Sequence, residues 1–128
     1  MNTEHLVAEF EAHTLDPADF RHAQHVQLAH ARLLKYDFVD ATTIYANGIR
    51  TIAAKHGAGD KFNVTITYAF LGLIAQRMAK STATTHADFV AKNPDLLSKD
   101  LLTQWYTDAQ LNSDTARTLF LMPTAQAR

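Results

Sequence analysis

Histidines recur in one short stretch, Phe20-Arg-His-Ala-Gln-His-Val-Gln-Leu-Ala-His30, whose spacing is typical of an amphipathic helix. At about 100° per residue, His22 falls at the centre of the apolar side, and His25 and His30 fall on its flanks. An imidazole that faces a protein core must be paired or must do chemistry. The sequence therefore locates a candidate site at the start of this helix, but it specifies no reaction.

Two kinds of chemistry suit His22 and His25. Neutral imidazoles one helical turn apart can bind a first-row divalent metal such as Fe, Zn, Mn or Cu, and three ligands with an open position make a catalytic site. Alternatively, one histidine held neutral by a helix N-terminus could act as a general base toward a small molecule. A structural role is also open, in which both rings bond to a backbone carbonyl, to Asp16 or to Asp19.

Composition limits the class of protein. The 128 residues fit one domain, and 12 basic and 13 acidic side chains nearly cancel, so we expect no nucleic-acid partner. The chain has no cysteine, which fits a reducing compartment, and no segment reaches the roughly 18 apolar residues of a membrane span. These features predict a cytoplasmic protein without a membrane partner. They give no indication of a nucleotide or a flavin.

Glycine and proline are rare, with four and three residues respectively, so the chain is expected to form long helices. Asp16-Pro17-Ala18-Asp19 is typical of a capped helix start and predicts one helix from there to about Tyr36. Further helices are expected over about 4–13, 85–92, 98–106 and 113–121. The fold predicted is an all-α, single-domain bundle of six to seven helices over residues 1–128, with a flexible tail from about 123.

The two central helices have clear boundaries in the sequence. Asp37 can cap a helix that ends at His56, before the left-handed terminator Gly57. Asn63 can cap the next helix, whose apolar side continues to Met78. The opening Val-Thr-Ile-Thr of this segment also suits a strand, but the helical spacing persists for three turns.

Short connections predict that the three helices after residue 16 run up, down and up as neighbours. The start of the histidine helix, the end of the next and the start of the third then meet at one end of the bundle. This arrangement would bring together His22, His25, His56 and Asn63, with Thr67 lining the same pocket. Free helix N-terminal amides there would favour an anionic ligand. Arg77 is interpreted as a snorkelling side chain, with an anion clamp as the alternative.

Three segments resemble a family of short, uncharacterised bacterial helical proteins: Phe20-Arg-His-Ala-Gln-His, Lys61-Phe-Asn-Val-Thr-Ile-Thr, and Leu101-Leu-Thr-Gln-Trp-Tyr ahead of Ser113. Members pair the His-x-x-His with Tyr-His-x-Thr-x-Thr and close with Glu-Pro-Asp. The resemblance implies a three-histidine site made from His22, His25 and position 63. Here position 63 is asparagine, and Leu121-Met-Pro-Thr lacks both acids. Either His56 or a carboxylate completes the metal shell, or this member has lost metal or activity.

Two hypotheses about function follow. The first is a small metal-dependent enzyme acting on a small organic molecule, with His22 and His25 as ligands or catalytic groups, His56 or Asn63 completing the shell, and Thr67 contacting substrate. The second is a non-catalytic module that binds an organic anion or a protein partner, with structural histidines. A homodimer is an open alternative in both.

Overall fold

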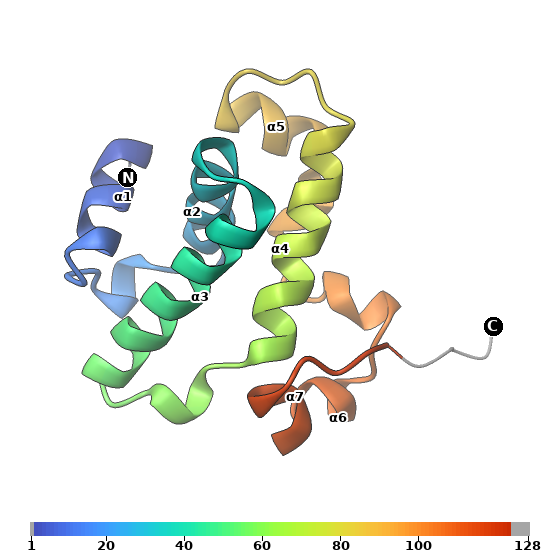
Figure 1. Ribbon diagram of the computed structural model, residues 1–128. Coiled ribbons are helices and arrows are strands. Elements are labelled where there is room, and N and C mark those ends of the chain that lie inside the picture. The colour runs from blue at the N-terminus through green and yellow to red at the C-terminus, as the bar shows by residue number, and fades with distance from the viewer. Residues whose placement is uncertain (1, 124–128) are drawn as a thin grey trace.

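The computed structural model describes residues 2–123, and within that range the chain is all-α, as predicted. Seven α-helices and four short 3-10 turns make up the fold, and no strand occurs among the described residues (Figure 1). The α-helices are α1 (Thr3–Glu11), α2 (His22–Lys35), α3 (Phe38–Lys55), α4 (Val64–Ala79), α5 (His86–Lys92), α6 (Asp108–Leu111) and α7 (Asp114–Thr118). The 3-10 turns are Pro17–Asp19, Gly59–Lys61, Pro94–Leu97 and Leu101–Gln104.

The boundaries of the two long helices α3 and α4 confirm the capping residues predicted from the sequence. The Asp37 carboxylate accepts from the Asp40 amide at 2.8 Å, and the Asn63 side chain accepts from the Ile66 amide at 2.9 Å. Both bonds satisfy amide groups that a helix start leaves without an intrahelical partner. At the other end of α3, Gly57 has φ of 70°, the left-handed conformation that glycine adopts at no steric cost.

The predicted single helix over 16–36 is divided in two. Asp16 caps only the 3-10 turn Pro17–Asp19, and the backbone then leaves helical geometry at Phe20, where φ is −115° and ψ is 76°. Helix α2 starts afresh at His22, where the Gln24 side chain accepts from the Arg21 amide at 3.1 Å. The break turns the Phe20 ring onto the His25 ring, with centroids 4.0 Å apart. The stacking of Phe20 on His25 thus takes the place of a continuous helix at this point.

The last third of the chain is less helical than predicted. The expected helix over 98–106 is a 3-10 turn from Leu101 to Gln104, and the one over 113–121 stops at Thr118. Helix α6, which the Thr107 hydroxyl caps by accepting from the Gln110 amide, has no counterpart in the prediction. The 3-10 turn Leu101–Gln104 and helix α7 both contact α4, and α6 contacts α7.

Helices α2, α3 and α4 contact one another in all three pairings and form the centre of the molecule (Figure 1). The C-terminal segment crosses the start of α4, where the fully buried Thr65 hydroxyl donates to the Leu119 carbonyl at 2.8 Å and accepts from the Leu121 amide at 2.9 Å. The predicted flexible tail falls on residues 124–128, outside the described range. Within residues 2–123, no helix has the length and apolar character needed to cross a membrane.

Candidate functional site

A cavity of about 340 Å³ lies between α2, α3 and α4, beside the predicted pair His22 and His25. Its wall is mainly apolar. The polar side chains that line it are His22, His25, Tyr45 and Lys99. Its apolar lining residues are Val26, Ala29, Ile66, Phe70, Leu71 and Ile74. A concave apolar wall with a few convergent polar groups is the usual form of a small-molecule site.

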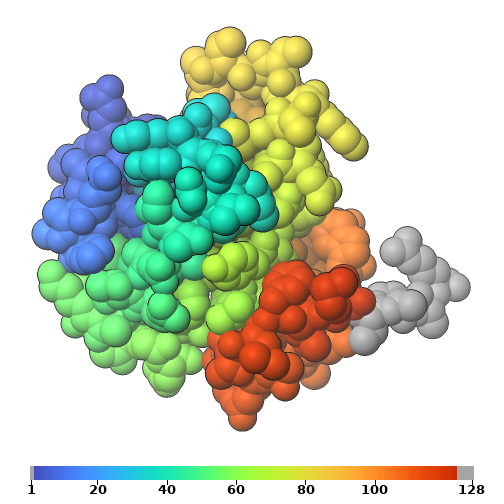
Figure 2. Space-filling model, in the orientation of Figure 1, coloured from blue at the N-terminus to red at the C-terminus, as the bar shows by residue number. Residues whose placement is uncertain are grey.

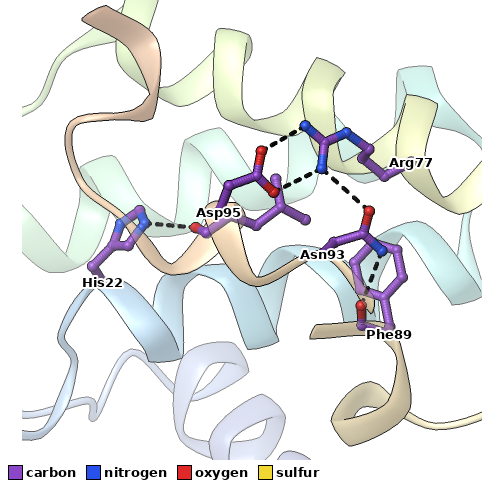
Figure 3. Close-up of polar contacts among 6 residues, drawn as sticks. His22, Arg77, Phe89, Asn93 and Asp95 are labelled. Atoms are coloured by element: carbon purple, nitrogen blue, oxygen red, sulfur yellow. Dashed lines mark hydrogen bonds and ion pairs between the residues drawn. The ribbon is translucent and has the colours of Figure 1, made fainter. Parts of the chain in front are cut away.

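His22 is held by an acceptor from a distant part of the chain. Its Nε2 lies 2.9 Å from the backbone carbonyl oxygen of Leu96, in the turn after α5 (Figure 3). A carbonyl can only accept, so Nε2 carries a proton, and in the neutral ring Nδ1 keeps its lone pair. The edge of the ring also meets Phe70, with centroids 4.9 Å apart. The bond to a backbone carbonyl that the structural interpretation of His22 predicts is therefore present, and one ring nitrogen is left as an acceptor.

His25 lies one turn further along α2 and is held by Tyr45. The Tyr45 hydroxyl can donate to either of two acceptors, the His25 Nδ1 atom at 3.1 Å or the His25 carbonyl oxygen at 3.5 Å, and Nδ1 is the closer. With Tyr45 as the donor, the neutral His25 ring carries its proton on Nε2. Burial first, and the neighbouring His22 second, lower the pKa of His25 to about 4. Near pH 7 this ring is therefore neutral and a weak proton acceptor.

Arg77 forms a partly exposed ion pair with Asp95. Its guanidinium donates two hydrogen bonds to the Asp95 carboxylate, both of 2.8 Å, and a third to the Asn93 side chain at 3.2 Å (Figure 3). The guanidinium lowers the pKa of Asp95. Asn93 in turn donates to the Phe89 carbonyl at 2.9 Å. Arg77 is thus not a free anion clamp, because its guanidinium is committed to the segment whose Leu96 carbonyl holds His22.

The structure separates the other predicted site residues from the cavity. His56 is an exposed residue at the end of α3 and lines a smaller space of about 210 Å³, which His25 also lines. The Thr67 hydroxyl donates to the Asn63 carbonyl at 2.7 Å, and the α4 residues on the 340 Å³ cavity are others. His25 therefore lines both spaces, whereas His22 lines the larger one and the predicted third ligand His56 lines the smaller one.

Both polar atoms of the Asn63 amide are engaged within the fold. The oxygen caps α4, and the nitrogen donates to the Leu111 carbonyl at 2.7 Å, which ties α6 to the start of α4. Asn63 also lines a polar space of about 510 Å³ beside Asp60 and Arg117, away from His22. Its side chain is therefore structural in this arrangement rather than a free donor.

The two roles of Asn63 can be separated by substitution. Asn63→Ala should lower the free energy of unfolding by about 2 kcal/mol, because the helix cap and a hydrogen bond to Leu111 are both lost. Asn63→Ser keeps a good cap and should cost only about 1 kcal/mol. Urea denaturation of both variants measures the difference. Equal losses would show that the helix cap contributes nothing to stability.

A second histidine pair lies outside the predicted site. His30 on α2 and His86 at the start of α5 have their Nδ1 atoms 3.0 Å apart, and the His30 ring stacks on Phe89 at 4.4 Å. Burial lowers the pKa of His30 to about 4, with a smaller contribution from His86, and also lowers the pKa of His86. The pair forms because α5 packs on α2.

Sequence reasoning missed three groups that shape the cavity. Tyr45 is buried on α3, and a buried tyrosine hydroxyl needs a partner, so its pairing could have been anticipated. Lys99 lies between two 3-10 turns, where the sequence predicts a helix over 98–106, and the Leu96 carbonyl is a backbone group whose partner no side-chain pattern specifies. Among residues 2–123, no group of three or more His, Cys, Asp or Glu side chains lies in a position to hold a metal ion.

Relatives give no further information about this site. Comparison with protein-family models, with curated proteins and with solved structures finds no match to this chain. The resemblance in the three sequence segments stays a prediction. The chain is an all-α protein in which two imidazoles, each held by a hydrogen bond, line one mainly apolar cavity.

Proposed function

We propose that this protein binds a small aromatic or aliphatic acid in the 340 Å³ cavity and that His22 accepts a hydrogen bond or a proton from it. The carrying observation is that His22 and His25, both held by defined partners, line one mainly apolar cavity. This function belongs to the class of small-molecule enzymes or enzyme-like binding proteins.

The hydrogen bond from His22 to Leu96 supports the role of proton acceptor. A catalytic base needs a fixed ring orientation and tautomer, which a bond from the opposite ring nitrogen to a carbonyl provides. Because Nε2 is committed to Leu96, Nδ1 is the nitrogen that would accept. His25, with its proton on Nε2 and a pKa of about 4, would act as a neutral hydrogen-bond donor.

Lys99 supports an acidic ligand. It is an exposed lysine on the wall of the cavity, and the described residues offer it no hydrogen bond or ion pair. An ammonium group at the edge of an apolar cavity would pair with a carboxylate while the remainder of the ligand contacts the apolar wall.

A divalent metal held by His22 and His25 is the second candidate. It is favoured by the one-turn spacing and by the low pKa of His25, since a neutral imidazole does not have to lose a proton before it coordinates Fe, Zn, Mn or Cu. The coordinating nitrogens would be Nδ1 of His22 and Nε2 of His25, with water or ligand completing the shell. For Nε2 to coordinate, the His25 proton would move to Nδ1, which would donate to the Tyr45 hydroxyl while that hydroxyl donates to the His25 carbonyl oxygen. The cytoplasmic location, the bacterial family and a homodimer stay predictions from the sequence.

Three related probes test the acid-binding proposal in the full chain. Mandelate carries a ring, a hydroxyl and a carboxylate, phenylacetate lacks the hydroxyl, and benzyl alcohol lacks the carboxylate. We expect mandelate to bind most tightly by calorimetry. Lys99→Met should remove the higher affinity of mandelate relative to benzyl alcohol, and His22→Asn should remove its higher affinity relative to phenylacetate. Each substitution should lower the affinity for mandelate about tenfold.

Matched controls keep the interpretation specific. Lys80→Met removes an exposed lysine beyond α4 that does not line the cavity and should leave all three affinities unchanged. Titration of Zn²⁺ into the wild type and the same variants tests the metal candidate. The acid-binding proposal is wrong if the three probes bind wild type equally, or if none of them shows saturable binding.

A further inference from the structure

A larger cavity, of about 550 Å³, lies on the side of α4 away from His22 and His25. It is bounded by the start of α3, by the turn after Leu101 and by the segment that follows α7. Figure 2 shows the start of α3 (cyan) and the C-terminal segment (red) on the same face, with α4 (yellow-green) between them. We name this cavity the aromatic groove, after its lining residues Phe38, Tyr68, Trp105, Tyr106 and Phe120.

We infer that the aromatic groove is a second binding site and that it takes a flat, uncharged aromatic molecule of two or three rings. None of the residues that line the groove is charged, so a charged ligand would lose its hydration there without gaining a partner. Five aromatic side chains provide faces and edges against which a planar ring system can stack. Phe38 and Phe120, on two different segments, are each 46% exposed.

Gly72 on the floor of the groove gives an independent indication of an occupant. It lies in the interior of the 16-residue helix α4, where glycine is less stable than alanine by roughly 0.5–1 kcal/mol. Packing within the protein does not require a glycine there, because a Cβ atom at this position would meet no atom within 4 Å. The missing side chain instead leaves open space along the helix backbone, where a planar molecule can lie.

Two polar groups define the length of the expected ligand. Tyr68, Gly72 and Gln76 follow one another at intervals of four residues on the same face of α4, and all three line the groove. Among the described residues, the Tyr68 hydroxyl and the Gln76 amide have no hydrogen-bond partner. Tyr68 and Gln76 are separated by about 12 Å along the helix axis. This spacing matches the length of a two- or three-ring molecule with a polar group at each end.

The fluorescent probe N-phenyl-1-naphthylamine, which is uncharged and carries a flat naphthalene ring system, tests this inference in the full chain. Trp105 is the only tryptophan and lines the groove, so its emission reports occupancy directly. We expect saturable binding of one probe per chain, with at least half of the Trp105 emission quenched at saturation. The sulfonated analogue 1-anilinonaphthalene-8-sulfonate should bind at least tenfold more weakly.

Substitutions on the floor of the groove assign the binding to this site. Gly72→Leu should weaken probe binding at least tenfold, and Gly72→Ala should weaken it about threefold. Gly72→Ala should also raise the melting temperature. Ala79→Leu, at an exposed position on the last turn of α4, should leave the affinity unchanged. The inference is overturned if both Gly72 variants bind like wild type, or if the sulfonate binds equally well. A dimer that Gly72→Leu dissociates would overturn it too, by assigning the groove to a second copy of the chain.

Discussion

Lowering the pH from 7 to 4 should remove a large part of the free energy of unfolding of this protein. Burial lowers the pKa of His25 and of His30 to about 4, whereas the ordinary value is 6.5. Between these two values the unfolded chain binds protons that the folded chain does not. The stability is therefore complete above about pH 6.5 and is lost as the pH falls toward 4, by up to about 3 kcal/mol for each ring.

The geometry of the two rings explains why neither charges easily. The Nδ1 atoms of His30 and His86 lie 3.0 Å apart, a distance that one shared hydrogen bond can span but two protonated rings cannot. His25 contacts the Phe20 ring and the Tyr45 hydroxyl, and the neighbouring His22 also disfavours its charged form. Charging either ring would create a buried cation without a carboxylate partner.

Urea denaturation at a series of pH values measures this effect. His30→Gln removes one of the two largest contributions, so the loss of stability between pH 6.5 and 4 should become clearly smaller, with His25 and His86 providing the remainder. His5→Gln is the matched control, because the His5 side chain is 59% exposed and lies 3.3 Å from the Glu9 carboxylate on its own helix. A free energy of unfolding that stays constant down to about pH 4.5 in wild type would contradict the desolvation of these rings.

Gly48→Ala should destabilise the protein by about 2 kcal/mol, although alanine is the better helix former. Gly48 is buried in the middle of α3, and a Cβ atom there would overlap the ring of Phe10 on α1. Phe10 is 2% exposed and also stacks near Tyr45, with ring centroids 6.3 Å apart, so its ring has little room to move. The added methyl group would push α1 away from α3.

A double-mutant cycle with Phe10→Leu identifies the cause of this loss. The smaller leucine side chain should leave room for the added methyl group, so Gly48→Ala should cost about 1 kcal/mol less in the Phe10→Leu background than in wild type. Gly72→Ala provides the opposite control, since its Cβ meets open space and should stabilise by about 0.5–1 kcal/mol. If the two glycine variants change stability equally, close packing of Phe10 is not the reason for glycine at position 48.

The candidate site could be located from the sequence because its first elements are local. The 3.6-residue period is sufficient to put His22 and His25 on the buried side of α2. The short connections around Asp37 and Gly57 are sufficient to make α2, α3 and α4 neighbours. The partners of the two rings were not predictable in the same way, since Leu96 is 74 residues from His22 and Tyr45 is 20 residues from His25.

The sequence by itself determined the helical class and the boundaries of α3 and α4, because caps such as Asp37 and Asn63 act on amides three residues away. Tertiary structure alone decided what the polar side chains do. Arg77 pairs with Asp95, His30 pairs with His86, and the Asn63 amide nitrogen bonds to Leu111. Each of these contacts joins positions at least 18 residues apart, whose approach depends on how the helices pack, and helical periodicity carries no information about that packing.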